Sequence, residues 1–168
     1  MWVTELVTVS TYLFRTIEDA TVESRPRNSP FSDADLFLGG RMYSIGTRQA
    51  EVTAEQETEI GLASACAVVT VPLVRDVLVP FYAEFTFHEG AVYAAQGTAQ
   101  VTSADVPEAG VVLAGCALRI VSGPRGCVGG AATSLSIFNP AGKEGAGTGS
   151  FWTLRAYFDA DGMGTIAR

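Results

Sequence analysis

The chain has 168 residues, of which 48% are hydrophobic and 17% are charged, and its formal net charge is −7. This length suits one domain, residues 1–168, whose core needs neither disulfides nor metals. The negative charge and the absence of any Lys/Arg cluster argue against nucleic acid as a partner, because phosphate binding needs a basic surface. We therefore expect a neutral or apolar small-molecule ligand.

Targeting and redox features are few. Residues 1–5 lack a basic region, and Glu5 and Arg15 interrupt any apolar run, so no signal peptide is predicted. No stretch approaches the roughly 20 apolar residues that span a bilayer. Cys66, Cys116 and Cys127 lie among small apolar residues without CxxC spacing, which predicts buried free thiols. We expect a cytoplasmic protein.

The first third of the chain predicts strands separated by polar loops. Residues 5–17 alternate with period two and are rich in β-branched residues, which favours a strand over the alternative of an amphipathic lid helix. Residues 18–33 are polar, contain two prolines and predict a loop or cap. The segment LFLGGRMYSIGTRQAEVTAE predicts a hairpin whose corner is either Gly39-Gly40 or the tripeptide SIG at 44–46.

The central part of the chain gives the clearest strand pattern. After a polar connection at 56–60, ASACAVVTVPLV predicts a strand that Pro72 places at an edge or near its end. In DVLVPFYAEFTFHEG, the face with Phe81 and Phe85 is so apolar that it must be buried, towards the interior. The Glu89-Gly90 pair turns the chain into AVYAAQGTAQVT, and VVLAGCALRIVSGPRGCVGGAATSLSIF follows as the next strand region.

The last elements complete an all-β pattern. Residues 139–149 are a glycine-rich loop, and in SFWTLRAYFDA the residues Trp152 and Leu154 share one face. About eight strands with Gly/Pro turns and no helical period predict a sandwich or barrel. An eight-stranded antiparallel barrel can hold one small ligand. Phe81, Phe85, Tyr93 and Trp152 inside it would shape an apolar pocket, and ordinary core packing is the alternative for each of them.

Most catalytic classes lack their residues here. His88 is the one histidine and is expected at an exposed turn, and Asp33 and Asp35 suit a solvated turn. There is no G-x-S-x-G elbow, no P-loop and no metal-ligand spacing, so neither a metal nor a cofactor is predicted. The remaining chemistry uses shape and a few hydrogen bonds. That suits a cyclisation promoted by proximity and by a hydrogen bond to a carbonyl group.

Four segments carry a resemblance to a family. GRMYSIGT, FTFHEGAVYAAQG, VSGPRGCVGG and SFWTLRAYF resemble the bacterial [4+2] cyclases (Diels–Alderases) that form spirotetronate and spirotetramate rings, in the allene oxide cyclase and dirigent group of barrels. The resemblance covers residues 35–158. It implies an eight-stranded antiparallel β-barrel of allene oxide cyclase or lipocalin type, capped by loops and the N-terminal segment. It also implies a cofactor-free homodimer that cyclises a linear polyketide-derived polyene.

The resemblance also implies site residues. Trp152 stands where that family's late-strand tryptophan packs on substrate, and Tyr82 or Tyr93 matches the tyrosine that reaches the substrate carbonyl. Glu84 and Gln96 are the further polar candidates on the same hairpin. The substrate-binding candidates beside Trp152 are Phe81, Phe85, Tyr43 and Leu154. The buried glutamate of allene oxide cyclases and the signal peptide of dirigent proteins have no match here, and the 139–149 loop has no counterpart.

Two other functions fit the same sequence. A lipocalin-like carrier would have the same lumen and no turnover. A structural or oligomerisation barrel would have a filled interior. An empty lumen separates the first from the second, and product formation separates the cyclase from the carrier.

Overall fold

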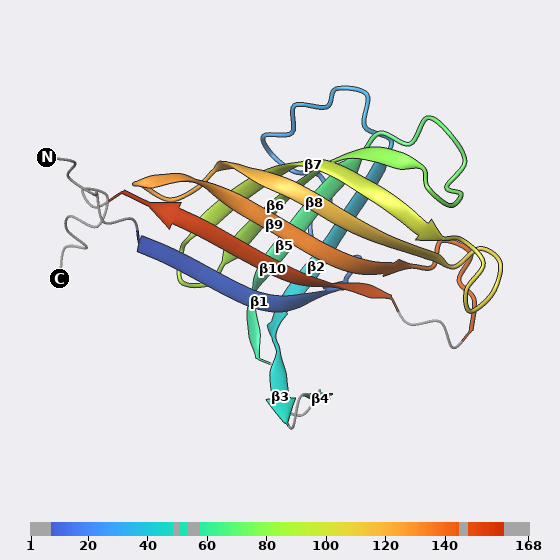
Figure 1. The fold of residues 1–168 in the computed structure, drawn as a ribbon, viewed down its shortest axis with the longest axis horizontal. Helices are drawn as coiled ribbons and strands as arrows, with labels where there is room; N and C mark the ends of the chain where they lie inside the picture. Colours follow the sequence, from blue (N-terminus) through green and yellow to red (C-terminus); the bar gives the residue numbers. More distant parts are fainter. Residues whose placement is uncertain (1–7, 49–50, 54–57, 145–147, 160–168) are drawn as a thin grey trace, which may run out of the picture.

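The structure, a computed structural model, describes residues 8–48, 51–53, 58–144 and 148–159. Within these residues there is no helix, and eight strands form a closed barrel in which every neighbouring pair is antiparallel (Figure 1). The predicted all-β, eight-stranded antiparallel barrel is therefore confirmed. The order around the barrel is β1 (Thr8–Glu18), β10 (Gly149–Phe158), β9 (Cys127–Phe138), β8 (Val112–Ser122), β7 (Val92–Ser103), β6 (Leu78–Phe87), β5 (Glu59–Ala67) and β2 (Leu36–Ser44), which pairs with β1 again.

Two short strands stand apart from the barrel. β3 (Gly46–Arg48) and β4 (Glu51–Thr53) pair with each other in a separate two-stranded sheet, which projects from the barrel wall in Figure 1. No helix in the described ranges is long and apolar enough to cross a membrane.

Of the two corners predicted for this segment, Gly39-Gly40 is wrong, because both glycines lie in the middle of β2, whereas at 44–46 β2 ends at Ser44 and β3 begins at Gly46. A Cβ atom on Gly40 would lie 2.5 Å from the carbonyl oxygen of Ile17, and one on Gly39 would lie 2.7 Å from that of Val22. Glycine is needed there because neighbouring backbone approaches closely, and no turn is involved. Of the polar connection predicted at 56–60, Gln56 lies outside the described residues, whereas Glu59 begins β5.

The long strand region predicted at 111–138 is two strands, β8 and β9. Residues 123–126 form the turn between them, where Gly126 has a φ of 85° and the amide of Cys127 donates to the carbonyl of Pro124. The strand predicted at 63–74 is β5, but it ends at Ala67, so Pro72 lies in the connection that follows; the alternative of an edge strand is wrong, because β5 pairs with both β2 and β6.

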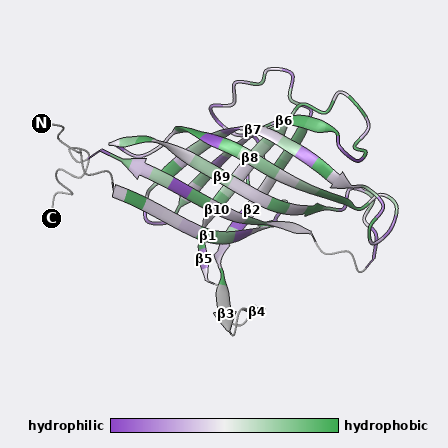
Figure 2. Ribbon diagram, viewed as in Figure 1, coloured by the Kyte–Doolittle hydropathy of each residue, from purple (hydrophilic) through white to green (hydrophobic). Residues whose placement is uncertain are grey.

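The barrel has two different ends. At one end, here called the loop end, four connections leave the strands: 19–35, 68–77, 104–111 and 139–148. At the opposite end, here called the turn end, β6 joins β7 and β8 joins β9 through the short turns 88–91 and 123–126. Figure 2 shows that hydrophobic residues recur along all the barrel strands, as expected where one face of each strand is buried.

The turn half of the lumen is filled by an aromatic cluster. Phe14 stacks on Trp152 with 6.5 Å between ring centroids, and Phe85 meets Trp152 edge-on at 4.9 Å. Tyr12 packs on Phe87 at 4.3 Å. Such packing stabilises a core beyond the burial of area alone. The members of the aromatic cluster are Tyr12, Phe14, Phe85, Phe87, Tyr93 and Trp152.

Residues 18–33 were predicted to be a loop or a cap; Glu18 ends β1, and the 19–35 connection is a loop that packs on the outer wall of the barrel. The buried Glu84 carboxylate accepts hydrogen bonds from the backbone amides of Arg27 (3.0 Å) and Asn28 (2.8 Å). The Arg25 guanidinium lies 4.1 Å from the ring centroid of Phe37. A small apolar cluster lies under this connection and consists of Cys66, Tyr82 and Ala94 with Phe31, Ala34 and Phe37.

Candidate ligand-binding site

The loop half of the lumen contains a cavity of about 240 Å³. Ligand pockets typically run from about 300 to 1,000 Å³, so this one suits a small molecule. Its wall is formed largely by aliphatic side chains from seven barrel strands and by two of the loop-end connections. The lining residues are Glu18, Leu36, Leu38, Ala67, Val69, Leu73, Val79, Phe81, Ala99, Val101, Val112, Ala114, Phe138, Asn139 and Pro140.

A smaller chamber of about 40 Å³ adjoins the cavity. Both share Glu18, Leu38, Phe81 and Phe138 as wall residues, so the two spaces are neighbours in the lumen. The chamber is bounded towards the turn end by Phe85 and Trp152, two members of the aromatic cluster. The lumen is therefore a pocket with one blocked end, and its opening faces the loop end.

Alternation along β1 places Thr16 and Glu18 on the luminal face, because Phe14 is fully buried there and every second residue follows it. The indole Nε1 of Trp152 donates to Thr16 Oγ1 at 3.3 Å. Glu18 lines both parts of the space, at the point where β1 ends. Burial raises the pKa of the Glu18 carboxyl above its ordinary value, since the apolar surroundings disfavour its charged form.

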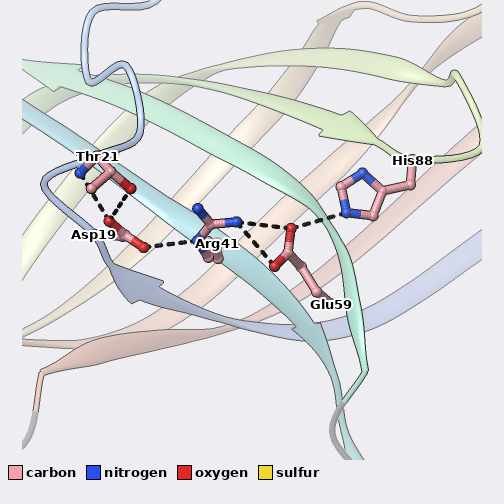
Figure 3. Close-up of polar contacts among 5 residues, drawn as sticks. All are labelled: Asp19, Thr21, Arg41, Glu59 and His88. Carbon is pink, nitrogen blue, oxygen red and sulfur yellow. Dashed lines mark hydrogen bonds and ion pairs between the residues drawn. The ribbon is translucent and has the colours of Figure 1, made fainter.

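The residue after Glu18 points outwards and is held by an ionic network (Figure 3). Arg41 Nε donates to Asp19 Oδ2 at 2.7 Å, and Arg41 Nη1 donates to Glu59 Oε2 at 3.1 Å. His88 Nε2 lies 3.0 Å from Glu59 Oε1. Hydrogen bonds from Thr21, and then from Arg41, lower the pKa of Asp19 to about 2. This network fixes the chain where Glu18 enters the lumen.

Three of the predicted substrate-binding residues line the pocket. Phe81 belongs to both of its parts, and Phe85 and Trp152 bound the chamber. Leu154 is fully buried in the barrel core but is absent from the pocket wall. Tyr93 is also luminal, yet it lies in the aromatic cluster near the turn end, 5.8 Å from Tyr12 between ring centroids.

The other predicted site residues lie outside the lumen. Tyr82 pairs with Gln96 in the β6–β7 register, and both alternate with luminal residues such as Phe81. Glu84 has the same orientation as Tyr82. The Tyr82 hydroxyl donates a hydrogen bond to the Glu84 carboxylate at 3.0 Å. Tyr82, Glu84 and Gln96 therefore do not reach a ligand in the pocket.

Tyr43 is also directed away from the lumen. It follows the fully buried Met42 and pairs with Arg15, which alternates with the luminal Phe14. Because side chains alternate across a strand, Tyr43 lies on the outer face of β2.

Sequence reasoning missed Thr16, Glu18 and Ser150. The sequence prediction begins a loop at Glu18, although positions 14, 16 and 18 lie on the same face of a strand, so that Glu18 follows Phe14 and Thr16 on the luminal face. Ser150 precedes Trp152 by two residues and so shares its luminal face. Extending period two from an aromatic anchor to the end of each strand would have found all three residues.

The thiols are not part of the pocket. All three cysteines are free, with Cys66 and Cys116 buried as predicted and Cys127 partly exposed. Burial raises the pKa of Cys116 to about 11, which leaves it inert as a nucleophile near neutral pH. Among the described residues, no group of three or more His, Cys, Asp or Glu side chains could hold a metal ion.

Comparisons with protein-family models, curated proteins and solved structures found no match for this chain. The pocket is therefore interpreted from its own geometry.

Proposed function

We propose that this protein is a cofactor-independent cyclase that promotes an intramolecular [4+2] (Diels–Alder-type) cyclisation of a linear, polyketide-derived polyene in its lumen. The observation that carries the proposal is the pocket itself: an apolar space, blocked at one end by aromatic rings and lined by one carboxyl side chain, Glu18. The four sequence segments that resemble spirocycle-forming cyclases support the same reaction.

The reaction asks little of the protein beyond confinement. A conjugated diene and an alkene of one molecule form two new carbon–carbon bonds, no atom is gained or lost, and no proton needs to move. A flexible chain reacts slowly because few of its conformers bring the two groups together. A pocket that accepts only folded conformers removes much of that entropic barrier, and oriented groups can react as if at effective molarities of about 10⁵ M or more.

Glu18 adds an electrostatic contribution. Burial shifts the Glu18 carboxyl towards its protonated form, and it is the protonated form that donates a hydrogen bond to a carbonyl oxygen. If that carbonyl is conjugated with the reacting alkene, the hydrogen bond withdraws electron density and lowers the barrier. Phe81, Phe85 and Trp152 would form the walls against which the diene packs.

The test uses 1,7,9-decatrien-3-one, a small linear ketone that carries a conjugated diene and an activated alkene. The wild-type protein should accelerate its conversion to a bicyclic ketone of the same mass, measured by gas chromatography against buffer alone. Ala99→Leu, which places three additional carbon atoms in the cavity, should lower the rate towards the buffer value. A wild-type rate equal to buffer, at a protein concentration that binds the trienone, would contradict the cyclase.

That outcome would favour a lipocalin-like carrier, the second candidate. The observation behind the carrier is the sparse polarity of the large cavity, where Glu18 and Asn139 are the polar side chains in the wall. A carrier would bind the trienone and return it unchanged.

Homodimerisation and a cytoplasmic location stay predictions from the sequence. The outer faces of β1, β9 and β10 expose Leu13 (61%), Leu135 (64%) and Phe151, and Phe151 pairs directly with Leu135. If the dimer forms through this surface, Leu135→Lys should convert it to monomer in sedimentation velocity. A wild-type protein that sediments as a monomer would refute the dimer.

A further inference from the structure

The hydroxyl group of Ser150, in the pocket, has no hydrogen-bond partner among the described residues. Ser150 is 8% exposed, and its side chain lines the small chamber. Its neighbour across the β9–β10 register, Ser136, is 1% exposed, but Ser136 Oγ lies 3.2 Å from Ser134 Oγ and is paired. Ser150 Oγ is not among the fully enclosed unpaired atoms, so it is accessible from the chamber that its side chain lines, and a molecule in the chamber can supply its hydrogen-bond partner.

A second hydroxyl group faces the same chamber. Thr16 lies directly opposite Ser150 in the β1–β10 register, and its Oγ1 accepts the indole N–H of Trp152. Accepting that bond uses an oxygen lone pair, which leaves the hydroxyl proton of Thr16 able to donate. Residues directly opposite on antiparallel strands have Cβ atoms about 4.5–5.5 Å apart, so one ligand atom can lie within reach of both hydroxyl groups.

We propose that Ser150 and Thr16 form a polar subsite that binds a carbonyl-type oxygen of the ligand. A carbonyl oxygen has two lone pairs and can accept from both hydroxyl groups at once. Besides these two hydroxyl groups, Glu18 and Ser64 are the polar residues among the described residues of the chamber wall, and no described lysine, arginine or histidine lines it to neutralise a carboxylate or phosphate. The proposal rests on the proposed ligand-binding function and adds the chemical class of the ligand, a ketone, ester or related carbonyl compound.

The sizes of the two spaces give the orientation of that ligand. The chamber of about 40 Å³ has room for a carbonyl group and an adjacent carbon or two, whereas the cavity of about 240 Å³ takes the hydrocarbon body. The carbonyl end therefore enters first and stops beside Trp152, and the chain extends towards the loop end.

The test compares two ligands that differ only at the carbonyl. 2-Decanone and 2-methyl-1-decene have the same arrangement of non-hydrogen atoms, with the C=O of the ketone replaced by C=CH₂ in the alkene. Each is titrated against protein loaded with the neutral fluorescent probe N-phenyl-1-naphthylamine. For each protein we compare the dissociation constant of the ketone with that of the alkene. In Ser150→Ala the ratio of ketone to alkene should rise by about five-fold relative to wild type, because the ketone loses one hydrogen bond.

Two further variants separate the hydroxyl group from side effects of substitution. Ser136→Ala removes a hydroxyl that is already paired, and it should leave the ratio unchanged. Ser150→Thr retains the hydroxyl and should keep the preference for the ketone, whereas Ser150→Val, of nearly the same shape, should lose it. This last pair decides the question if Ser150→Ala does not fold.

The outcomes are distinct. If neither compound displaces the probe from wild type, the proposed binding function itself fails. If both compounds displace the probe but the ratio of their dissociation constants is the same in wild type and in Ser150→Ala, the subsite is refuted. The same holds if the ratio does not differ between Ser150→Thr and Ser150→Val. In either case the Ser150 hydroxyl bonds only to water. A shift in Ser150→Ala and Ser150→Val alone supports the subsite.

Discussion

Replacing Ala99 by leucine should stabilise the protein while narrowing the pocket. Ala99 lies on the luminal face of β7 and lines the cavity of about 240 Å³. A leucine there adds three carbon atoms, which can occupy empty space without displacing a neighbour. Small-to-large changes normally destabilise a packed core by about 1–3 kcal/mol, so a gain in stability would be unusual.

The expected gain follows from the apolar surface that the new atoms bury. Each buried CH₂ contributes about 0.8 kcal/mol, so three carbons contribute at most about 2.4 kcal/mol. Fixing the leucine rotamer costs about 0.5–1 kcal/mol. The net change in the free energy of unfolding should therefore be a gain of about 1–2 kcal/mol.

The matched control is Ala95→Leu, on the same face of the same strand. Ala95 is fully buried and does not line the pocket, because the aromatic cluster occupies that level of the lumen. Adding three carbons there should destabilise the protein by about 1–3 kcal/mol. Urea unfolding, with the midpoint compared at a constant m-value, measures both changes.

A loss of stability in Ala99→Leu similar to that in Ala95→Leu would refute the reasoning. It would mean that the loop half of the lumen is already filled, and the structural-barrel function would then be favoured.

Three further substitutions test other parts of the molecule. Trp152→Ala should lower the free energy of unfolding by about 3–5 kcal/mol, because this side chain is 5% exposed and packed in the aromatic cluster. A variant as stable as wild type in urea would contradict that packing. Glu84→Gln should weaken the two hydrogen bonds from backbone amides that hold the 19–35 connection, and tryptic cleavage after Arg27 should therefore be faster. Probe binding should not change. An unchanged cleavage rate would show that these bonds are not needed to hold the connection. Asp19 has a folded pKa of about 2, below its ordinary 3.8, so its stabilisation is present above about pH 4 and is lost as the pH falls towards 2. The stability difference between wild type and Asp19→Asn should therefore shrink over that pH range, and a constant difference would rule out the bonds from Thr21 and Arg41 as its source.

The barrel could be predicted from the sequence because its strands alternate so regularly. Phe81, Phe85 and Phe87 at every second position identify a buried face, and the short glycine turns limit how the strands connect. The corner assigned to Gly39-Gly40 was wrong for a physical reason. A glycine in a turn and a glycine under a crossing backbone look the same in a sequence, and only the three-dimensional approach of Ile17 separates them.

The site was harder to predict than the fold. Tyr82 and Glu84 attract attention as polar residues on a hydrophobic strand, but they alternate with Phe81 and so must face the other way. Their role is to hold the 19–35 connection, whose position on the outer wall cannot be predicted from local patterns. Glu18 and Ser150 were missed because each lies at the end of a strand, where sequence patterns fix boundaries least well.

The most direct test of the central claim is a titration of the wild-type protein and Ala99→Leu with N-phenyl-1-naphthylamine, followed by fluorescence. If the loop half of the lumen is the binding pocket, the wild type takes up one probe per chain in a saturable manner, and Ala99→Leu, though folded and at least as stable, takes up none. Equal uptake by both proteins would place the probe elsewhere, for example on the exposed outer face of β1, β9 and β10, and would contradict a luminal binding site.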